Sequence, residues 1–285
     1  MVARLIEGES VARAITDRVR SDVAALGKAP KLVAVLASDN PGAKFYAKSQ
    51  EKACAEVGIA YELRELPADS SAERLKAEVA RVNADDSVSG VILLMPVPQG
   101  VNPREIQMAI HPDKDVEGIH PANIGRLFYG DFSLAPCTPH AVVTILREAG
   151  VDLKGKETVV VGHSEIVGKP TLVMLLQSVM ESPTVTCCHI ATRDLALHTR
   201  RAEVLIVAAG KAGLVKGDMV REGAVVVDVG INRVKVDGKT KIVGDVEFEG
   251  ASQRASAITP VPGGVGLVTT AMLLKNTVEC ARRQG

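Results

Sequence analysis

The chain has 285 residues, of which 46% are hydrophobic and only 2% aromatic, and its 34 basic and 34 acidic side chains cancel. This length accommodates two domains of ordinary size, and so high a hydrophobic content excludes an intrinsically disordered chain. The neutral balance gives no indication of a nucleic-acid-binding face, and no apolar run reaches the ~18 residues of a membrane span. We therefore expect a globular protein without nucleic-acid or membrane partners.

The cysteines and histidines predict neither a disulfide framework nor a metal site. The five cysteines are scattered without CxxC spacing, which is typical of reduced thiols. Apart from His163, the histidines lack metal-ligand spacing and are expected at the surface or in hydrogen bonds. Charges interrupt the apolar stretch at 1–7, unlike a signal peptide, so we expect a cytoplasmic protein.

The first part of the chain alternates helix-like and strand-like segments. Ser10 is a candidate N-cap for a helix with an apolar face at four-residue spacing, and Ser71 opens a later helix. Between and after them the pattern predicts a strand at 32–36, a helix at 44–57, a strand at 61–66 and a strand at 90–95. Alternation of this kind indicates right-handed crossovers and a parallel sheet.

A second α/β unit is expected after a proline-rich stretch, with a domain hinge between residues 120 and 140. Further strands are expected at 158–161, 184–188, 204–207 and 224–229, followed by a helix at 268–283 that packs on the first domain. The predicted fold class is therefore α/β with two domains. Residues 1–125 with 268–285 form an α/β substrate domain, and residues 126–267 form a Rossmann-like nucleotide-binding domain.

The segment 162–170 has the local form of a nucleotide-binding loop, because it follows an aliphatic strand and opens an apolar helix. Gly162 lets the turn tighten, Gly168 allows close backbone approach, and a helix N-terminus attracts a pyrophosphate. The segment departs from G-x-G-x-x-G, so an ordinary strand-to-helix turn is the alternative. His163 either hydrogen-bonds a phosphate or lies exposed on the loop.

Eight stretches together resemble one family. They are Tyr46 to Cys54, Met95 to Pro98, Lys114 to Gly118, Pro136 to Pro139, Gly162 to Pro170, Asp228 to Asn232, Gly244 to Val246 and Thr259 to Gly266. In this order and spacing, the chain resembles the methylenetetrahydrofolate dehydrogenase/cyclohydrolase family over essentially its whole length. The resemblance implies a folate cleft between two α/β domains, a nicotinamide cofactor and a homodimer.

The resemblance also implies the site residues. For the cofactor they are Gly162, His163, Ser164, Ile166, Gly168, Ile190, Ala191, Arg193 and Ile231. For the folate they are Tyr46, Leu94, Glu117, Pro260, Pro262, Gly263 and Gly264, and the catalytic positions are Tyr46, Gln50 and Glu117. Family members oxidise 5,10-methylenetetrahydrofolate to the methenyl form, and most then hydrolyse the product to 10-formyltetrahydrofolate.

The three positions that serve hydrolysis in the family all differ in this chain. The family's lysine is Gln50, its glutamine is Leu94, and its aspartate is Glu117. An amide has no usable protonation equilibrium near neutral pH, whereas hydrolysis needs an acid/base group. Lys48 and Lys52 point roughly 200° away from Gln50 on a helix. The departures predict a dehydrogenase without cyclohydrolase activity, because hydride removal depends mainly on binding geometry.

The nicotinamide is expected to be NAD, with NADP the family default. The family often has arginine at the position of His163, and serine with lysine or arginine at the positions of Ile190 and Ala191. Of the residues that follow, Arg193 would suit the 2′-phosphate of NADP, and Asp194 would suit the ribose hydroxyl of NAD. Three other functions stay open: a bifunctional enzyme that recruits Lys48 or Lys52, a dehydrogenase for a methanopterin-type carrier, and a silent folate- or nucleotide-binding paralogue.

Overall fold

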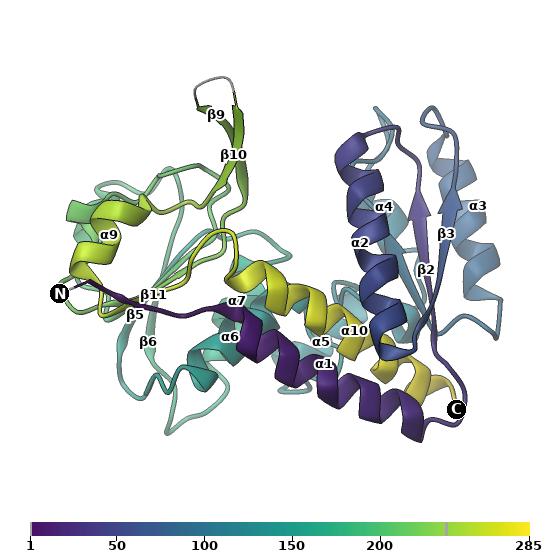
Figure 1. The fold of residues 1–285 in the computed structure, drawn as a ribbon, viewed down its shortest axis with the longest axis horizontal. Helices are drawn as coiled ribbons and strands as arrows, with labels where there is room; N and C mark the ends of the chain where they lie inside the picture. Colours follow the sequence, from purple (N-terminus) through teal and green to yellow (C-terminus); the bar gives the residue numbers. More distant parts are fainter. Residues whose placement is uncertain (1, 237–238) are drawn as a thin grey trace. The chain divides into compact units, whose positions relative to one another are not determined.

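The computed structural model describes residues 2–236 and 239–285, which form two compact units (Figure 1). Unit 1 contains the residues up to Ala12 together with Thr138–Thr269. Unit 2 contains Arg13–Cys137 together with Thr270–Gly285. Helices α1 (Gly8–Ala25) and α10 (Val265–Gln284) each contribute residues to both units.

Unit 2 is built on a parallel sheet in the order β3-β2-β4, and Figure 1 shows α2 and α3 running alongside it. Its remaining elements are β2 (Lys31–Leu36), α2 (Pro41–Val57), β3 (Ala60–Glu65), α3 (Ala72–Asn83), β4 (Gly90–Leu93), α4 (Pro103–Gln107), η1 (Pro112–Lys114) and α5 (Pro121–Phe128). Strand β2 is aliphatic and almost wholly buried, as expected for the centre of a parallel sheet. Side chains of α3 and α4 pack with β2 and β4 in one hydrophobic core.

Helix α2, which carries the predicted catalytic positions, is fixed at both ends. The Asn40 side chain accepts hydrogen bonds from the backbone N–H groups of Gly42 (2.8 Å) and Ala43 (3.2 Å), and Pro41 occupies the first turn. At the other end Gly58 adopts a left-handed conformation (φ 80°) that L side chains avoid, and closes the helix. The two caps thereby fix where α2 begins and ends.

Unit 1 contains a larger parallel sheet, in the order β1-β11-β8-β7-β5-β6 within the described residues. Its strands are β1 (Arg4–Leu5), β5 (Glu157–Val161), β6 (Thr184–Cys188), β7 (Val204–Val207), β8 (Val225–Asp228) and β11 (Ala257–Ile258). The other elements are α6 (Cys137–Glu148), α7 (Gly168–Leu175), α8 (Leu195–Thr199), η2 (Gly217–Met219), the antiparallel pair β9 (Asn232–Val236) and β10 (Lys239–Val243), and α9 (Phe248–Arg254). The chain passes from β6 across β5 to β7, so the strand order reverses between β5 and β7. In doubly wound sheets, ligands bind at such a reversal.

The structure confirms the predicted two-domain α/β fold with parallel sheets. Several details differ from the sequence prediction. Ser10 does not cap α1, because the helix already begins at Gly8, and β4 ends at Leu93 rather than at residue 95. Strands β1 and β11 were not predicted, since two-residue strands carry too little pattern, and the five-residue strands β9 and β10 were not predicted either.

The compact units also differ from the predicted domain limits. Residues 2–12 lie in unit 1, because β1 pairs with β11 and the Gly8 N–H donates to the Gly263 carbonyl (2.8 Å). The division between the units falls at Cys137 and Thr138, inside the range expected for the hinge but beyond residue 125. The end of α10 is grouped with unit 2.

Candidate functional site

The turn after β5 shows why unit 1 has glycine at positions 162 and 168. Gly162 has φ +129°, and a Cβ there would lie 2.1 Å from the Ala208 carbonyl oxygen at the end of β7. A Cβ at Gly168 would lie 2.1 Å from the Gly162 carbonyl oxygen. The two glycines therefore allow the turn, the start of α7 and the end of β7 to pack backbone against backbone.

Ser164 organises the N-terminus of α7. Its Oγ accepts hydrogen bonds from the N–H groups of Val167 (3.1 Å) and Gly168 (3.4 Å), and its carbonyl accepts one from Lys169 (3.0 Å). Because the Ser164 side chain is exposed and its oxygen already accepts two bonds, its hydroxyl proton can be donated outward to an anion. The loop thus fits a pyrophosphate, with Ser164 as a donor and the dipole of α7 behind it.

The ends of β5 and β6 meet through two histidines. The His163 and His189 rings contact edge to face with centroids 4.7 Å apart. His189 Nδ1 accepts a hydrogen bond from the Ala191 N–H (3.2 Å), so Nε2 carries the proton in neutral His189. His189 was assigned no cofactor role from the sequence. A histidine at the end of the second strand of a Rossmann unit could have suggested one.

The residues that follow His189 line the part of the sheet edge where coenzymes are distinguished in Rossmann folds. Ile190 is 66% exposed, and Ala191 and Arg193 are exposed as well. Asp194 adopts a left-handed conformation (φ 46°) and its carboxylate caps α8 by accepting from the Leu197 N–H (3.1 Å). One oxygen of Asp194 is therefore occupied by the protein itself.

The remaining predicted residues of unit 1 lie in three loops. Ile231, 65% exposed, stands between β8 and β9, and Ile166 is 54% exposed on the phosphate loop. The loop from Pro260 to Gly264 contains a cis peptide before Pro262, and Gly263 has φ +107°. A Cβ at Gly8 would lie 2.1 Å from the Gly264 carbonyl oxygen, so this loop lies directly on the start of α1.

In unit 2, α2 places Tyr46 and Gln50 one turn apart on the same face. Gln50 is only 1% exposed, and its Oε1 accepts a long hydrogen bond from the Tyr61 hydroxyl (3.4 Å). Gln50 Nε2 is buried and has no hydrogen-bond partner among the residues that the structure describes. A buried amide donor without a partner is costly, and such a group is often found where a ligand supplies the acceptor.

Tyr46 remains a neutral hydroxyl at physiological pH. Desolvation raises the pKa of Tyr46 to about 12, and the neighbouring Gln50 side chain opposes the shift. The side chain is still 43% exposed, so one face of the ring is available for stacking. Tyr46 also interacts electrostatically with Glu117, which brings these two predicted residues close together.

Leu94 follows β4, with its N–H donated to the Val35 carbonyl (2.9 Å), and is 2% exposed. Its apolar side chain provides no hydrogen bond at the position where the family has glutamine. Lys48 and Lys52 are exposed on the opposite face of α2, and Lys52 lies 4.0 Å from Glu56 in an ion pair. The sequence expectation that they point away from Gln50 is therefore confirmed.

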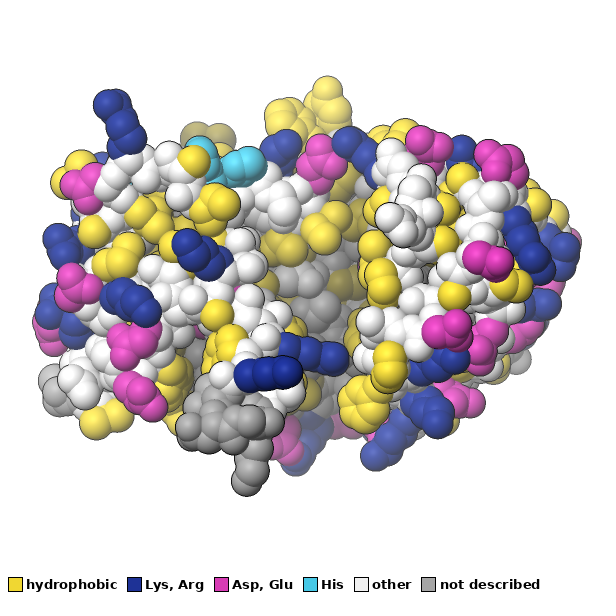
Figure 2. All heavy atoms as spheres, turned by 90° about the horizontal axis from the view of Figure 1, so that it is seen from above, with side chains coloured by type: hydrophobic (Ala, Val, Ile, Leu, Met, Phe, Trp, Pro, Cys, Tyr) yellow, Lys and Arg dark blue, Asp and Glu magenta, His cyan; other side chains and the backbone are white. Residues whose placement is uncertain are grey.

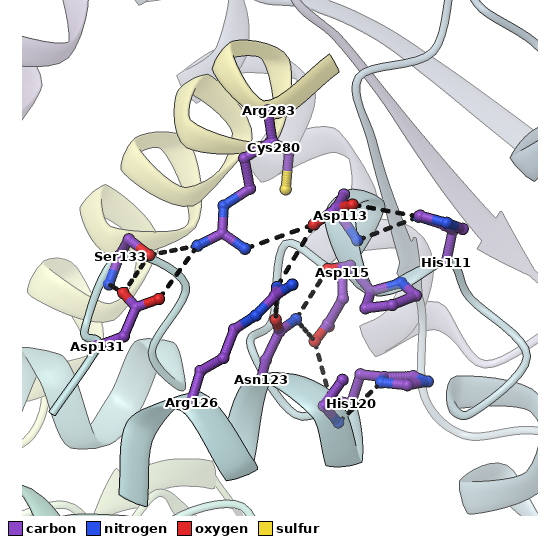
Figure 3. A network of polar contacts seen from close by, with 12 residues as sticks. His111, Asp113, Asp115, His120, Asn123, Arg126, Asp131, Ser133, Cys280 and Arg283 are labelled. Atoms are coloured by element: carbon purple, nitrogen blue, oxygen red, sulfur yellow. Dashed lines mark hydrogen bonds and ion pairs between the residues drawn. The ribbon is translucent and has the colours of Figure 1, made fainter. Parts of the chain in front are cut away.

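The backbone on either side of Glu117 is held by a polar network, and Figure 3 shows its part around Asp115. Asp115 accepts hydrogen bonds from the N–H groups of Gly118 (3.1 Å) and His120 (2.8 Å) and from Asn123 Nδ2 (2.9 Å). From α10, Asn276 Nδ2 donates to the Val116 carbonyl (2.9 Å). The turn around Glu117 is thus fixed on both sides.

Arg283, near the end of α10, extends this network, as Figure 3 shows. It pairs with Asp113 (3.4 Å) and Asp131 (3.7 Å) and donates a hydrogen bond to Ser133. Arg126 also pairs with Asp113 (3.4 Å). The C-terminal helix therefore stabilises the loop on which Glu117 is placed.

The Glu117 carboxyl group titrates near neutral pH. Desolvation is the main cause, and repulsion by Asp115 adds to it, so that the pKa of Glu117 is raised to about 8. Lys114, three positions before Glu117, cannot compensate, because its Nζ donates to the carbonyl oxygens of Asn83 (2.9 Å), the last residue of α3, and of Asp85 (2.7 Å). The Glu117 carbonyl accepts from the Cys137 N–H (3.3 Å), but its carboxyl group has no hydrogen bond or ion pair with the residues that the structure describes.

The sequence reasoning missed Asp115, Asn123 and Asn276 as supports of the site. A detectable signal existed for Asn276, which is a polar residue on the apolar face of a predicted helix and is fully buried. Such a residue normally has hydrogen-bond partners on a neighbouring element. Nothing in the spacing of Asp115 or Asn123 indicated that they meet.

The charges on the surface are mixed in sign, as expected from equal numbers of basic and acidic residues (Figure 2). Figure 2 shows basic and acidic side chains interspersed on the face it draws, without a large region of one sign. Among the described residues, no group of His, Cys, Asp and Glu side chains could hold a metal ion. In the same residues no helix is both long and apolar enough to cross a lipid bilayer.

These features define a class of protein before any comparison is made. Unit 1 has a parallel sheet with a strand-order reversal and a glycine turn leading into a helix, which is the architecture of a dinucleotide-binding domain. Family models match both parts of the chain. Residues 136–285 match the tetrahydrofolate dehydrogenase/cyclohydrolase NAD(P)-binding domain, and residues 6–117 match the catalytic domain of the same family.

Individual relatives agree with the family models. The bifunctional protein FolD of Moorella thermoacetica is 47% identical over 286 residues, covering 99% of this chain and 100% of that protein. The crystal structure of the bifunctional enzyme FolD, methylenetetrahydrofolate dehydrogenase/cyclohydrolase, from Campylobacter jejuni has a TM-score of 0.93 at 43% identity, covering 99% and 100% of the two chains. A Trypanosoma brucei homologue, complexed with NADP cofactor and inhibitor, has a TM-score of 0.92 at 37% identity, covering 99% and 98%. The chain belongs to the tetrahydrofolate dehydrogenase/cyclohydrolase family.

Proposed function

We propose that this protein is an NAD(P)-dependent 5,10-methylenetetrahydrofolate dehydrogenase of one-carbon metabolism that lacks cyclohydrolase activity. The carrying observation is the buried amide at Gln50, 1% exposed, where the family has its lysine. Lys48 and Lys52 are exposed on the other face of α2, and Lys114 is bound to carbonyl oxygens. None of these three lysines therefore takes the place of the family's base.

The chemistry of the first step fits the residues that remain. Oxidation removes hydride with its electron pair from the methylene carbon and leaves a cation shared by two folate nitrogens; the nicotinamide, when bound, accepts that hydride. Gly162, Ser164 and Gly168 would hold the pyrophosphate of the cofactor. Tyr46 would stack on the pterin and donate its neutral hydroxyl, and an ionised Glu117 would accept pterin N–H groups and favour the positive product.

Hydrolysis of the methenyl group places different demands on the protein. Water must be deprotonated and a proton must be delivered, and a positioned acid/base group typically contributes about 10²–10⁴-fold. Gln50 cannot exchange a proton near neutral pH, and Leu94 cannot orient a base or a water. The two substitutions together support the loss of the second activity.

A second candidate is a bifunctional enzyme, which two observations favour. The relatives at 46–50% identity are named bifunctional proteins. In addition, the pKa of Glu117 is raised to about 8, which gives unit 2 one carboxyl group that can exchange protons near neutral pH. In this alternative Glu117, rather than a lysine, would activate the water.

One assay separates the two candidates. Purified protein is given methylenetetrahydrofolate and either NAD or NADP, and the absorbance of the methenyl product is followed. Accumulation of the methenyl compound, with decay at the buffer rate, supports the monofunctional enzyme. Rapid clearance supports the bifunctional one. Parallel assays with methylene-tetrahydromethanopterin test the alternative carrier, and absence of turnover on either carrier would favour a silent binding paralogue.

For the cofactor we propose NAD, with assembly as a homodimer. The apolar Ile190 and the small Ala191 support NAD, since neither offers a cation to a 2′-phosphate; Arg193 is the nearest cation in the sequence. The relative solved with NADP makes NADP the alternative. The ratio of kcat/KM for NAD and NADP tests the first proposal, and light scattering after size-exclusion chromatography tests the second.

A further inference from the structure

Two buried carboxylates in unit 1 lie next to the nucleotide loop and have no part in the function described so far. Asp228 at the end of β8 is 4% exposed, and Asp245 after β10 is 0% exposed. Neither pairs with a lysine or arginine among the residues that the structure describes. A buried charge without a counter-ion is costly, so hydrogen bonds must stabilise both groups.

The hydrogen bonds of Asp245 hold the loop that follows β7. Its Oδ2 accepts from the N–H groups of Ala209 (2.6 Å) and Gly210 (2.8 Å). Its Oδ1 accepts from Asn232 Nδ2 (2.8 Å) at the start of β9. One carboxylate thus joins the end of β7 to the segment that follows β8.

Asp228 in turn holds Asp245 in place. Its Oδ1 accepts from the N–H groups of Asp245 (3.0 Å) and Gly230 (2.9 Å), and its Oδ2 accepts from the Val246 N–H (2.9 Å). Desolvation, the largest cause, raises the pKa of Asp228 to about 6 against the effect of these three donors. The two aspartates therefore form one buried hydrogen-bonded unit.

Two glycines make room for the carboxylates. A Cβ at Gly230 would lie 2.3 Å from Asp245 Oδ1, and a Cβ at Gly244 would lie 1.8 Å from Asp228 Oδ2. Any side chain at either position would therefore collide with a carboxylate. The stretches Asp228 to Asn232 and Gly244 to Val246, which looked like separate motifs in the sequence, are two parts of one arrangement.

This arrangement contacts the cofactor loop directly. The Ala208 carbonyl belongs to the same peptide group as the Ala209 N–H, which donates to Asp245. A Cβ at Gly162 would lie 2.1 Å from the oxygen of that carbonyl, so the Gly162 turn packs against the backbone that Asp245 holds. Strands β7 and β8 lie on the side of β5 opposite to β6. In a dinucleotide fold the β6 side takes the adenosine, so the β7–β8 side takes the nicotinamide half.

We propose that Asp228 and Asp245 are positioning residues that fix the β7 and β8 loops, including Ile231, against the nicotinamide half of the dinucleotide. Neither residue needs to touch the cofactor. They act by holding the Ala209–Gly210 backbone and the Gly230–Asn232 turn in one geometry before the cofactor binds, which lowers the entropy cost of binding. The inference rests on the proposed NAD(P)-dependent function.

The substitution Asp245→Asn tests the proposal, because it preserves shape and replaces one acceptor oxygen by an NH₂ group that faces other donors. Fluorescence titration should show the Kd for NADH, or for NADPH if that is the preferred cofactor, raised roughly 10–100-fold. The KM for methylenetetrahydrofolate at saturating cofactor should change by less than about threefold. A uniformly damaged protein would not show this split.

Glu203→Gln is the matched control, at the amino-terminal end of β7. The Glu203 carboxylate binds Lys156 Nζ (3.0 Å) and accepts from the Glu157 N–H (3.1 Å), so it is a hydrogen-bonded carboxylate of the same sheet, although it pairs with a lysine. We expect this variant to lower the Tm and to leave the Kd for NADH within about twofold of wild type. Equal increases of the Kd in both variants would mean general destabilisation and would overturn the proposal.

A folded Asp245→Asn variant that binds NADH with wild-type affinity overturns this inference alone. Should that variant not fold, Asn232→Ala decides, since it removes the bond to Asp245 Oδ1 (2.8 Å) and otherwise only a long bond to the Val243 carbonyl (3.4 Å). A rise of the Kd for NADH of about threefold or more supports the proposal, and an unchanged Kd overturns it. Wild-type protein that binds neither NADH nor NADPH would instead overturn the proposed function, and this inference with it.

Discussion

The two compact units differ in how far their site residues follow the family pattern. In unit 1 the glycine turn, Ser164 and the Asp228–Asp245 arrangement form a tightly packed strand-end region in which side chains and backbone depend on one another. In unit 2 the fold is equally ordered, but Gln50, Leu94 and Glu117 stand where the family has lysine, glutamine and aspartate. All three changes at the positions that serve hydrolysis therefore lie in unit 2, whereas the changes in unit 1, at His163, Ile190 and Ala191, concern the choice of cofactor.

This difference corresponds to the two chemical steps of the family. Hydride transfer needs a bound cofactor and a bound folate in the correct position, which are demands on both units. Hydrolysis adds a demand for proton transfer, which falls on the α2, β4 and Glu117 positions of unit 2. Substitutions at those positions can remove the second step while the first survives, provided that the changed residues still bind folate.

The largest expected effect comes from disrupting the glycine turn of unit 1. Gly162→Val adds a branched side chain at φ +129° whose Cβ would lie 2.1 Å from the Ala208 carbonyl oxygen. We expect unit 1 to lose about 2–6 kcal/mol of stability from overpacking and backbone strain, and nicotinamide binding to be lost. Thermal unfolding and NADH titration measure the two effects.

Gly125→Ala is the control for this substitution, because a Cβ at Gly125 would meet nothing within 4 Å and no left-handed φ is required there. It should leave both the Tm and cofactor binding nearly unchanged. A folded Gly162→Val variant with unaltered affinity for NADH would show that the turn does not hold the cofactor.

The second prediction concerns the three substituted positions of unit 2. Because of these substitutions, we expect methenyltetrahydrofolate to accumulate during turnover. Restoring the family residues by Gln50→Lys, Leu94→Gln and Glu117→Asp together should accelerate its hydrolysis, up to the about 10²–10⁴-fold that acid/base assistance provides. Absorbance decay of the methenyl compound measures the rate, and the rate of its formation serves as the control for hydride transfer.

Gln50→Lys alone is the informative partial variant. Its new amine would enter a position that is 1% exposed, without the polar partner that a glutamine at position 94 would provide, so little hydrolysis should return. Wild-type enzyme that clears the methenyl compound about a hundredfold faster than buffer would disprove the monofunctional proposal. Loss of that clearance in Glu117→Gln would then identify Glu117 as the base.

Much of the fold could be predicted from the sequence, because long aliphatic strands and amphipathic helices carry a strong periodic signal. Strands β2 and β5 are examples, with nearly every residue buried. Strands β1 and β11 have two residues each, and they exist because their neighbours in the sheet provide hydrogen-bond partners. No local pattern contains that information.

The site residues, too, could be predicted from the sequence only in part. Positions aligned with a family motif, such as Tyr46 and Glu117, could be singled out from the sequence, and their proximity in the structure agrees with that choice. The groups that hold them, Asp115 and Asn276, come from segments more than a hundred residues apart and meet only in the folded chain. Likewise, the sequence does not show that one oxygen of the Asp194 carboxylate caps α8 and is therefore occupied by the protein itself.

A third prediction sharpens the cofactor choice in unit 1. Ala191→Arg would place a guanidinium beside the exposed Ile190, where a 2′-phosphate of NADP is expected. A charge-assisted phosphate contact contributes about 1.5–3 kcal/mol, so kcat/KM for NADP should rise roughly 10–150-fold while that for NAD changes little. Ala191→Gln is the neutral control. A wild-type preference for NADP above about a hundredfold would indicate that Arg193 or His163 already binds the phosphate.

The smallest expected effect is a pH dependence that arises in unit 2 from Glu117. Burial raises the pKa of Glu117 to about 8, so the unliganded protein carries mostly the neutral acid below that pH and mostly the carboxylate above it. If the carboxylate accepts the pterin N–H groups, kcat/KM for methylenetetrahydrofolate should rise about tenfold between about pH 7 and about pH 9 and then level off, since kcat/KM reports the free enzyme.

Glu117→Gln should remove this inflection, because an amide does not titrate. The same shift has the opposite sign for stability: the folded pKa of Glu117 lies above its unfolded value, so its contribution to stability is lost as the pH rises between about 4.5 and about 8. Wild-type protein should therefore lose more stability than Glu117→Gln over that range, as measured by urea unfolding at each pH. A kcat/KM profile that keeps its inflection in Glu117→Gln would assign the titration to another group. The Glu117 carboxylate would then have no measurable part in binding the folate.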